Sequence, residues 1–227
     1  MLRTLADARN PGSLSNRLRQ RRFRLFDSLV ESRPRPLRIV DLGGTPQFWV
    51  HRGWAGREDV EITTVNLTPE PSRHANIASR SGDATDLRDL PDHAFDVVFS
   101  NSVIEHLFTL ERQAAMAREI RRLAPAFWVQ TPNYWFPIEP HFHVPGWQWM
   151  PTGVRRAVIR RRRCGWRGPC PNPRDADAAV REVRLLTRRE LERLFPGATI
   201  VAERFGGLAK SWMVHDGFNR GPEVDDA

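Results

Sequence analysis

The sequence has little cysteine and almost no lysine, and it contains no long hydrophobic run. Its only cysteines are Cys164 and Cys170, and two thiols cannot by themselves build a disulfide framework or a four-ligand zinc site. No apolar stretch approaches the roughly 18–20 residues that a membrane-spanning helix needs. Residues 1–30 are rich in arginine and lack the apolar core and the cleavage site of a secretory signal. We therefore expect a reduced, cytoplasmic protein that does not span a membrane.

The composition is that of a globular protein with a strong preference for arginine. Hydrophobic residues make up 40% of the 227 positions and charged residues 27%, which is typical of one large folded domain. The net charge is +8 with a single lysine, Lys210, and genomic base composition explains this bias better than nucleic-acid binding does. The positive charge gathers in residues 17–24 and 155–167, which are either solvated helix faces or surfaces for an anionic partner.

Hydrophobic periodicity predicts alternating strands and helices. Helices are expected over residues 15–31 and 110–123 and after the capping box Thr187–Glu190; strands are expected over 37–42, 60–66, 94–100 and 126–131, with a short one ending near 81–85 and closing strands over 199–205 and 210–215. This alternation indicates an α/β fold, a Rossmann-like, doubly wound and mostly parallel sheet.

The chain divides by pattern into five segments. We interpret them as an N-terminal helical arm (1–36), a cofactor-binding half of the sheet (37–131), a lid or insertion after the fifth strand (132–186), a closing helix and strands of the same domain (187–220) and a disordered tail (221–227). The lid segment has no clean period. It is rich first in proline and aromatic residues and then in arginine.

Polar and small residues follow the predicted strands at their carboxyl ends, where ligands bind in open parallel sheets. They are Asp41, Gly43, Gly44, Asn66, Asp83, Ala84, Ser100, Asn101 and Thr131. Thr45, Pro46 and Gln47 fill the later positions of a G-x-G-x-x-G fingerprint, and no Gly-Lys-Ser/Thr occurs. A dinucleotide loop of that type and a P-loop are therefore excluded.

Four segments in order carry a resemblance to a known family. They are Val40–Gly44 (VDLGG), Val65–Leu67 (VNL), Gly82–Ala84 (GDA) and Phe95–Leu107 (FDVVFSNSVIEHL). Together they resemble the class I S-adenosyl-L-methionine-dependent methyltransferases, in particular the small-molecule branch with an IEHL motif after strand 4. The resemblance covers residues 37–131 and implies a transferase that uses S-adenosyl-L-methionine for methylation.

The resemblance also implies roles for individual residues. Asp41, Gly43 and Gly44 would surround the methionine part of the cofactor, with Ser100 and Asn101 as the wall beside it. Asn66 would face the ribose, and Asp83 and Ala84 would face the adenine. The sequence departs from the family pattern at Thr45, where a second spaced glycine is usual, and at Asn66, where an acid is usual.

Candidate catalytic residues lie after the fourth strand and in the lid. His106, His141 and His143 are candidate general bases because histidine titrates near neutral pH, and Glu139 lies between prolines and aromatics in the same stretch. Aromatic walls with few polar groups are typical of small-molecule pockets. We expect O-methylation of a small polar acceptor, such as a sugar-like or secondary-metabolite hydroxyl. Purely structural roles are the alternatives: the Glu105–His106 pair would form hydrogen bonds to the following helix, and the aromatic stretch would only cover the sheet.

Three further interpretations remain open at this point. Small-RNA 2′-O-methyltransferases hold a divalent ion on two glutamates and two histidines, but Ser102 stands at the place of one glutamate, so we expect no metal. The arginine clusters suit a nucleic-acid methyltransferase, which is possible but not favoured. Thr45 and Asn66 suit a non-enzymatic binding protein of the same fold. Oligomeric state does not follow from the sequence.

Overall fold

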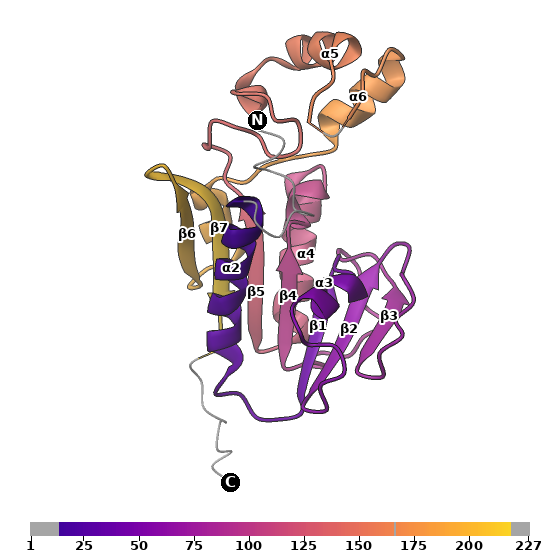
Figure 1. The fold of residues 1–227 in the computed structure, drawn as a ribbon, viewed down its shortest axis with the longest axis vertical. Helices are drawn as coiled ribbons and strands as arrows, with labels where there is room; N and C mark the ends of the chain where they lie inside the picture. Colours follow the sequence, from indigo (N-terminus) through magenta and orange to yellow (C-terminus); the bar gives the residue numbers. More distant parts are fainter. Residues whose placement is uncertain (1–13, 166, 219–227) are drawn as a thin grey trace.

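The computed structural model describes residues 14–165 and 167–218, which form one seven-stranded sheet (Figure 1). The strands are β1 (Leu37–Leu42), β2 (Val60–Asn66), β3 (Ile77–Ser81), β4 (Val97–Asn101), β5 (Ala126–Pro132), β6 (Thr199–Phe205) and β7 (Leu208–Asp216). Their order is β3-β2-β1-β4-β5-β7-β6, with β1 to β5 parallel and β7 antiparallel to both neighbours. The predicted Rossmann-like fold is confirmed. The predicted tail, 221–227, lies outside the described residues.

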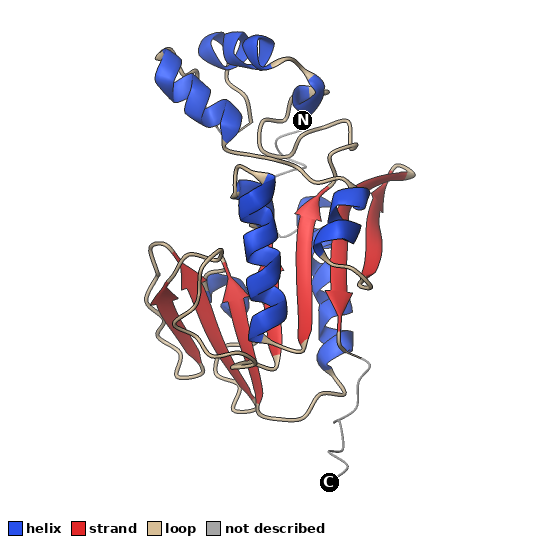
Figure 2. Cartoon of the chain, turned by 180° about the vertical axis from the view of Figure 1, so that it is seen from behind, coloured by secondary structure: helices blue, strands red, loops and turns tan. Residues whose placement is uncertain are grey.

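Helices cover both faces of this sheet. α2 (Leu14–Val30) and α3 (Pro46–His51) lie on one face, in front in Figure 1, and α4 (Leu110–Leu123) lies on the other, in front in Figure 2. α7 (Arg188–Leu194) packs with α4, since Leu191 and Leu194 share a core with Ile120. A short 3₁₀ turn, η1 (Ile104–His106), follows β4. The capping box predicted at Thr187 and Glu190 is present at the start of α7.

An aromatic core fixes α2 against the sheet. Phe26 is fully buried, and its ring centre lies 4.8 Å from that of Phe99 on β4 and 6.3 Å from that of Trp49 on α3. Burying a phenylalanine of this kind contributes about 1.5–3 kcal/mol, with more from edge-to-face contacts. The predicted amphipathic helix is thus confirmed, and its position sets arginines of its first turns beside the end of β4.

The segment between β5 and α7 is an insertion with a small core of its own, and we call it the lid below because it lies where a lid was expected. It contains η2 (Trp147–Trp149), α5 (Thr152–Arg161) and α6 (Pro173–Arg181), and both helices stand above the carboxyl ends of the parallel strands (Figure 1). Phe142 and Trp147 stack with ring centres 4.3 Å apart within this core. In the described part of the chain, no helix is both long and apolar enough to cross a bilayer.

Candidate functional site

The loop after β1 is built around two glycines that have no room for a side chain. Gly43 has a φ of +80°, and a Cβ there would lie 2.5 Å from a methyl carbon of Val103. A Cβ on Gly44 would lie 1.7 Å from Oδ2 of Asp41. Real carbon atoms do not approach this closely, so the loop is held between the turn after β4 and the end of its own strand. Only glycine fits at either position.

Asp41 lies beneath this loop and positions it. The residue is 1% exposed, and Nε1 of Trp49 donates a hydrogen bond of 2.8 Å to its Oδ2. Its Oδ1 has no hydrogen-bond partner among the described residues. Burial raises the pKa of Asp41 to about 7, although the Trp49 bond opposes this shift. The carboxyl group therefore connects the loop to α3, while its assignment around the methionine moiety stays a prediction.

The polar residues after β2 and β3 bond to the protein itself. Nδ2 of Asn66 donates to the carbonyl oxygen of Gly44 and ties β2 to the loop. Asp83 accepts from the backbone N–H of Thr85 at 2.9 Å, from its Oγ1 at 2.7 Å and from Arg112 at 2.8 Å. Partial burial opposes ionisation of Asp83, but these donors outweigh it and lower the pKa. Their predicted roles toward ribose and adenine stay predictions.

The two residues predicted beside the methionine moiety differ in orientation. Ser100 is fully buried, and its Oγ donates to the carbonyl oxygen of Leu42 at 3.1 Å. Its hydroxyl thus joins β4 to β1 within the sheet. Asn101 is half-buried and lines a cavity between α2, α3 and β4. Ser102, with a φ of +59°, donates from Oγ to Oε1 of Gln130 at 2.8 Å.

Glu105, His106 and His141 converge above β4 and β5. One donor atom from each lies within 4.8 Å of the others. Glu105 is fully buried, and Oγ1 of Thr131 donates to its Oε2 at 2.9 Å. Its Oε1 has no hydrogen-bond partner among the described residues. Burial raises the pKa of Glu105 to about 7. The sequence identified Glu105 and His106 as neighbours in the chain. It did not show that the buried carboxyl group of Glu105, with one oxygen unbonded among the described residues, lies against the lid.

Glu139 orients His141 from the lid side of this cluster. Glu139 is 1% exposed, and its Oε1 lies 2.5 Å from Nδ1 of His141. Its Oε2 accepts the backbone N–H groups of His141 and Phe142 at 2.7 and 2.6 Å. Burial lowers the pKa of His141, but the bond and charge of Glu139 outweigh it and the net shift is upward. The other imidazole nitrogen, Nε2, is thus left for a proton or a ligand.

The two remaining histidines differ in their relation to this pair. His106 lies edge-on to His141, with ring centres 4.8 Å apart, and burial together with that neighbour lowers its pKa. His143 lies outside the convergent group. Its backbone N–H donates to the carbonyl oxygen of Glu139 at 2.9 Å, and its φ is +51°. Three of the four predicted catalytic residues therefore come together.

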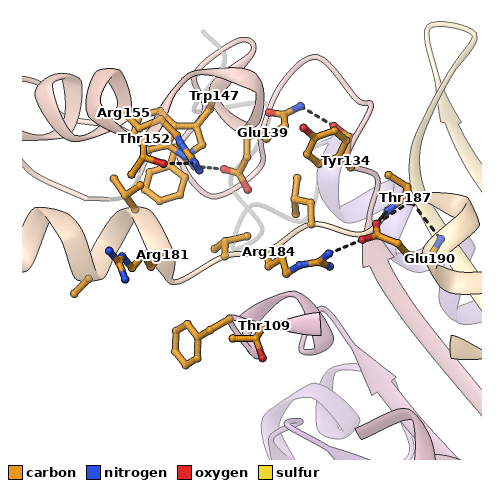
Figure 3. A pocket seen from close by; sticks show the side chains of 17 residues that line it. Thr109, Tyr134, Glu139, Trp147, Thr152, Arg155, Arg181, Arg184, Thr187 and Glu190 are labelled. Carbon is orange, nitrogen blue, oxygen red and sulfur yellow. Dashed lines mark hydrogen bonds and ion pairs between the residues drawn. The ribbon is translucent and has the colours of Figure 1, made fainter. Parts of the chain in front are cut away.

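A cavity of about 960 Å³ opens between the lid and the helices α4 and α7, with Glu139 in its wall (Figure 3). Tyr134, Phe142 and Trp147 give it aromatic walls, and Gln148 and Thr109 give it uncharged polar groups. Further lining residues are Arg155, Arg181, Arg184, Thr187 and Glu190. Sequence reasoning missed Thr109 and Arg184. Thr109 is the N-cap of α4, and the preference for threonine at helix N-caps is a sequence signal that could have identified it.

Comparisons with known proteins agree with this geometry. Residues 44–125 match a family model described as a methyltransferase domain. A solved structure described as a putative Zn-dependent alcohol dehydrogenase from Rhodobacter sphaeroides shares the fold, with 13% identity, a TM-score of 0.53 and 85% of this chain and 87% of that chain covered. No curated protein matches the chain.

Two solved structures described as S-adenosylmethionine-dependent methyltransferases are also similar. One is from Aquifex aeolicus, with 11% identity and a TM-score of 0.49 over 85% of this chain and 87% of that chain. The other is from Mesorhizobium loti, with 17% identity and a TM-score of 0.48 over 84% of this chain and 95% of that chain.

Proposed function

We propose that this chain is a class I methyltransferase that uses S-adenosylmethionine and methylates a hydroxyl group of a small polar acceptor bound beneath the lid. One observation carries the proposal. Glu139, whose carboxylate is bonded to the imidazole of His141, lies in the wall of a cavity of about 960 Å³ between the lid and the helices α4 and α7. This volume lies within the range of about 300–1,000 Å³ that is typical of small-molecule sites.

The chemistry that this pair supports is removal of the acceptor's proton. In methyl transfer, the acceptor oxygen attacks the methyl carbon in line, the carbon–sulfur bond breaks and its electron pair stays on sulfur. The hydroxyl proton passes to Nε2 of His141. A base works best with a pKa near the operating pH; burial lowers the pKa of His141, but the bond and charge of Glu139 outweigh burial and raise it, which strengthens the imidazole as a base. Holding the reacting oxygen and the methyl group about 3–3.5 Å apart supplies much of the remaining acceleration.

The lining of the cavity favours a compact, hydroxylated acceptor. The half-buried Tyr134 offers a flat face that can stack on a ring. Gln148 is held by its Nε2, which donates to the carbonyl oxygens of Tyr134 and Phe136. Arg184 pairs with Glu190 and with Gln113 rather than standing free for a phosphate. A sugar-like or phenolic hydroxyl compound therefore suits the site better than a polynucleotide does.

A divalent cation at the Glu105–His106–His141 cluster is the second candidate mechanism. The observation that favours it is the buried carboxyl group of Glu105. Its Oε1 has no hydrogen-bond partner among the described residues, and one of its oxygens lies within 4.8 Å of a nitrogen of each imidazole. A bound cation would lower the pKa of an acceptor hydroxyl. Against it, Ser102 bonds to Gln130, so the cluster offers three donors and no second carboxylate at that place. Prolonged dialysis against a chelator decides between the two, and we expect turnover to persist.

A screen of methyl acceptors with labelled cofactor tests the proposed function. Sugars, polyols, phenols and a structured RNA are offered separately, and we expect label in a low-molecular-weight hydroxyl compound. Binding of the demethylated cofactor is measured in parallel, because a ligand at 100 times its Kd adds about 2.7 kcal/mol of stability. Label found only in RNA contradicts the small-acceptor proposal. Absence of any cofactor-induced shift contradicts the methyltransfer reaction itself.

A further inference from the structure

A second cavity, of about 540 Å³, lies between α2, α3 and the carboxyl end of β4. Figure 1 shows these two helices on the same face of the sheet. Its walls are aromatic, with Phe23, Phe48, Phe99 and Trp128, and its polar groups come from Arg19, Arg22, His51, Arg52, Asn101 and Ser102 among others. No described aspartate or glutamate lines it. The cavity is therefore a positively charged site with apolar walls.

Arg52 is held in place in this cavity with its charge uncompensated. Its guanidinium carbon lies 5.3 Å from the ring centres of both Phe23 and Phe48, which fixes the group by cation–π contact. Its Nε is buried and has no hydrogen-bond partner among the described residues. Burial is the main cause that lowers the pKa of Arg52, and the positive charge of Arg19 is the second. Two guanidinium groups therefore repel each other across the cavity.

The charge of the nearby Arg22, in contrast, is compensated by a carboxylate. Its Nε lies 2.9 Å from Oε1 of Glu203, and Lys210 lies 3.7 Å from the other oxygen of that carboxylate. Glu203 also accepts a hydrogen bond from Ser211. The acid on this side of α2 is thus already shared. Neither Arg19 nor Arg52 forms an ion pair with a described carboxylate, although the charge of Glu203 acts on Arg19. Arg52 is half-buried and Arg19 is exposed, and an anion bound between two positive charges is attracted by both.

We propose that Arg19 and Arg52 form a carboxylate-binding site that takes the methionine carboxylate of the cofactor. Arg52 is the C-cap of α3, the first element after the Gly43–Gly44 loop, and Asn101 in the same cavity is one of the two residues expected beside the methionine moiety. Arginine forks bind carboxylates with two parallel hydrogen bonds. An anionic group on the acceptor has the same chemistry and is the other source. The inference rests on the cofactor assignment and is independent of the acceptor.

Calorimetric titration of full-length variants tests this site with two probes that differ in one group. The probes are S-adenosylhomocysteine and its decarboxylated analogue. The variants are Arg52→Met and Arg19→Met, which keep the aliphatic stem, and the control is Arg17→Gln on the exposed side of α2. We expect each methionine variant to bind S-adenosylhomocysteine about 10- to 100-fold more weakly, as for loss of a hydrogen bond to a charged group, and to bind the analogue as the wild type does.

The outcomes distinguish the cofactor carboxylate from an anionic group of the acceptor, and they distinguish failure of this proposal from failure of the cofactor assignment. Unchanged affinity for both probes overturns the assignment to the cofactor carboxylate, and a raised KM for an anionic acceptor in the same variants then assigns the two arginines to the acceptor. Equal weakening of both probes means that the arginines only support the fold, which overturns the proposal. Unchanged affinity and unchanged KM overturn it as well. Wild-type protein that fails to bind S-adenosylhomocysteine overturns the cofactor assignment instead, and Arg52→Lys, which restores the charge, checks that a loss is not due to misfolding.

Discussion

Two regions of the site differ in how their polar groups are paired: the strand-end residues predicted to hold the cofactor, called the cofactor half below, and the cluster of Glu105, His106 and His141. At the ends of β2 to β4, Asn66, Asp83 and Ser100 each form a hydrogen bond inside the protein. In the cluster, an oxygen of the fully buried Glu105 has none among the described residues, and two imidazoles lie beside it. Side chains that are already bonded can shape a cradle and leave binding to the backbone. Groups left incompletely paired can take and release protons, so we expect the chemistry in the second region.

Replacing His141 is expected to have the largest effect and to fall on the second region alone. His141→Gln removes the proposed base while keeping a polar side chain of similar reach. Loss of a general base lowers kcat by about 10²- to 10⁴-fold. Affinity for S-adenosylhomocysteine should stay within twofold, because His141 is placed in the lid and not at the strand ends. Steady-state kinetics and calorimetry on the same preparation check both halves. A cofactor affinity that falls as steeply as kcat breaks the division between the regions.

A methyl group on the loop glycine tests the first region. In Gly43→Ala, Cβ would lie 2.5 Å from Val103 at a φ of +80°, whereas Gly53 has a φ of +75° and open space around it. Gly53→Ala therefore isolates the cost of the backbone angle. Overpacking adds about 1–3 kcal/mol, so we expect Gly43→Ala to lose both stability and cofactor binding relative to that control.

The same comparison can be made sharper by removing the contact. Val103→Ala supplies space where the added methyl group would lie, so the double variant Gly43→Ala/Val103→Ala should regain most of the lost cofactor affinity. Thermal unfolding with and without S-adenosylhomocysteine measures this recovery. If the single variant binds the cofactor as Gly53→Ala does, the glycine is not part of the cradle.

Removing the Glu139 carboxylate should change the pH dependence of turnover more than its maximum. The base works in its neutral form, so activity rises as the pH rises through the pKa of His141. Burial lowers that pKa, and the Glu139 bond and charge more than reverse this shift. In Glu139→Gln the acid limb of the kcat/KM profile should therefore move to lower pH, with a loss of about 10-fold in rate from a less well-oriented imidazole. An acid limb that stays in place assigns it to another group.

The sequence allowed the framework of the fold to be predicted, but not the partners at the strand ends. The near-continuous apolar run of residues 94–100 predicts β4, because a parallel strand buried on both faces needs apolar side chains on both. α3 was missed because a helix of six residues, Pro46–His51, is too short to show a helical period in its sequence. α6 was missed in a polar segment, although Asn172 before Pro173 is a helix-start signal.

The candidate site divides in the same way. Glu139 and His141 are two residues apart, so their pairing is local and lay within reach of sequence reasoning. The bond from Asn66 to Gly44 spans 22 positions and that from Ser100 to Leu42 spans 58. Such contacts depend on strand order and register, which a single sequence does not fix. Arg52 was missed because it lies outside every motif. Only the fold brings it close to Arg19 and to the rings of Phe23 and Phe48.

The smallest expected effect concerns Asp41, the one acid of the cofactor half that resembles the cluster. Burial raises its pKa from 3.8 to about 7, so the folded protein holds this proton more tightly than the unfolded chain does. Its stabilising contribution is complete below the ordinary pKa and is lost as the pH rises through about 7. Asp41→Asn keeps an acceptor for Trp49 and cannot ionise. Between pH 5 and 7 the melting temperature of this variant should fall less than that of the wild type, by at least about 2–4 °C, which corresponds to about 1 kcal/mol. Glu58→Gln, at an exposed position, serves as the control. Identical pH slopes for the variant and the wild type mean that Asp41 stays ionised, and the two regions then differ even more than their hydrogen bonds indicate.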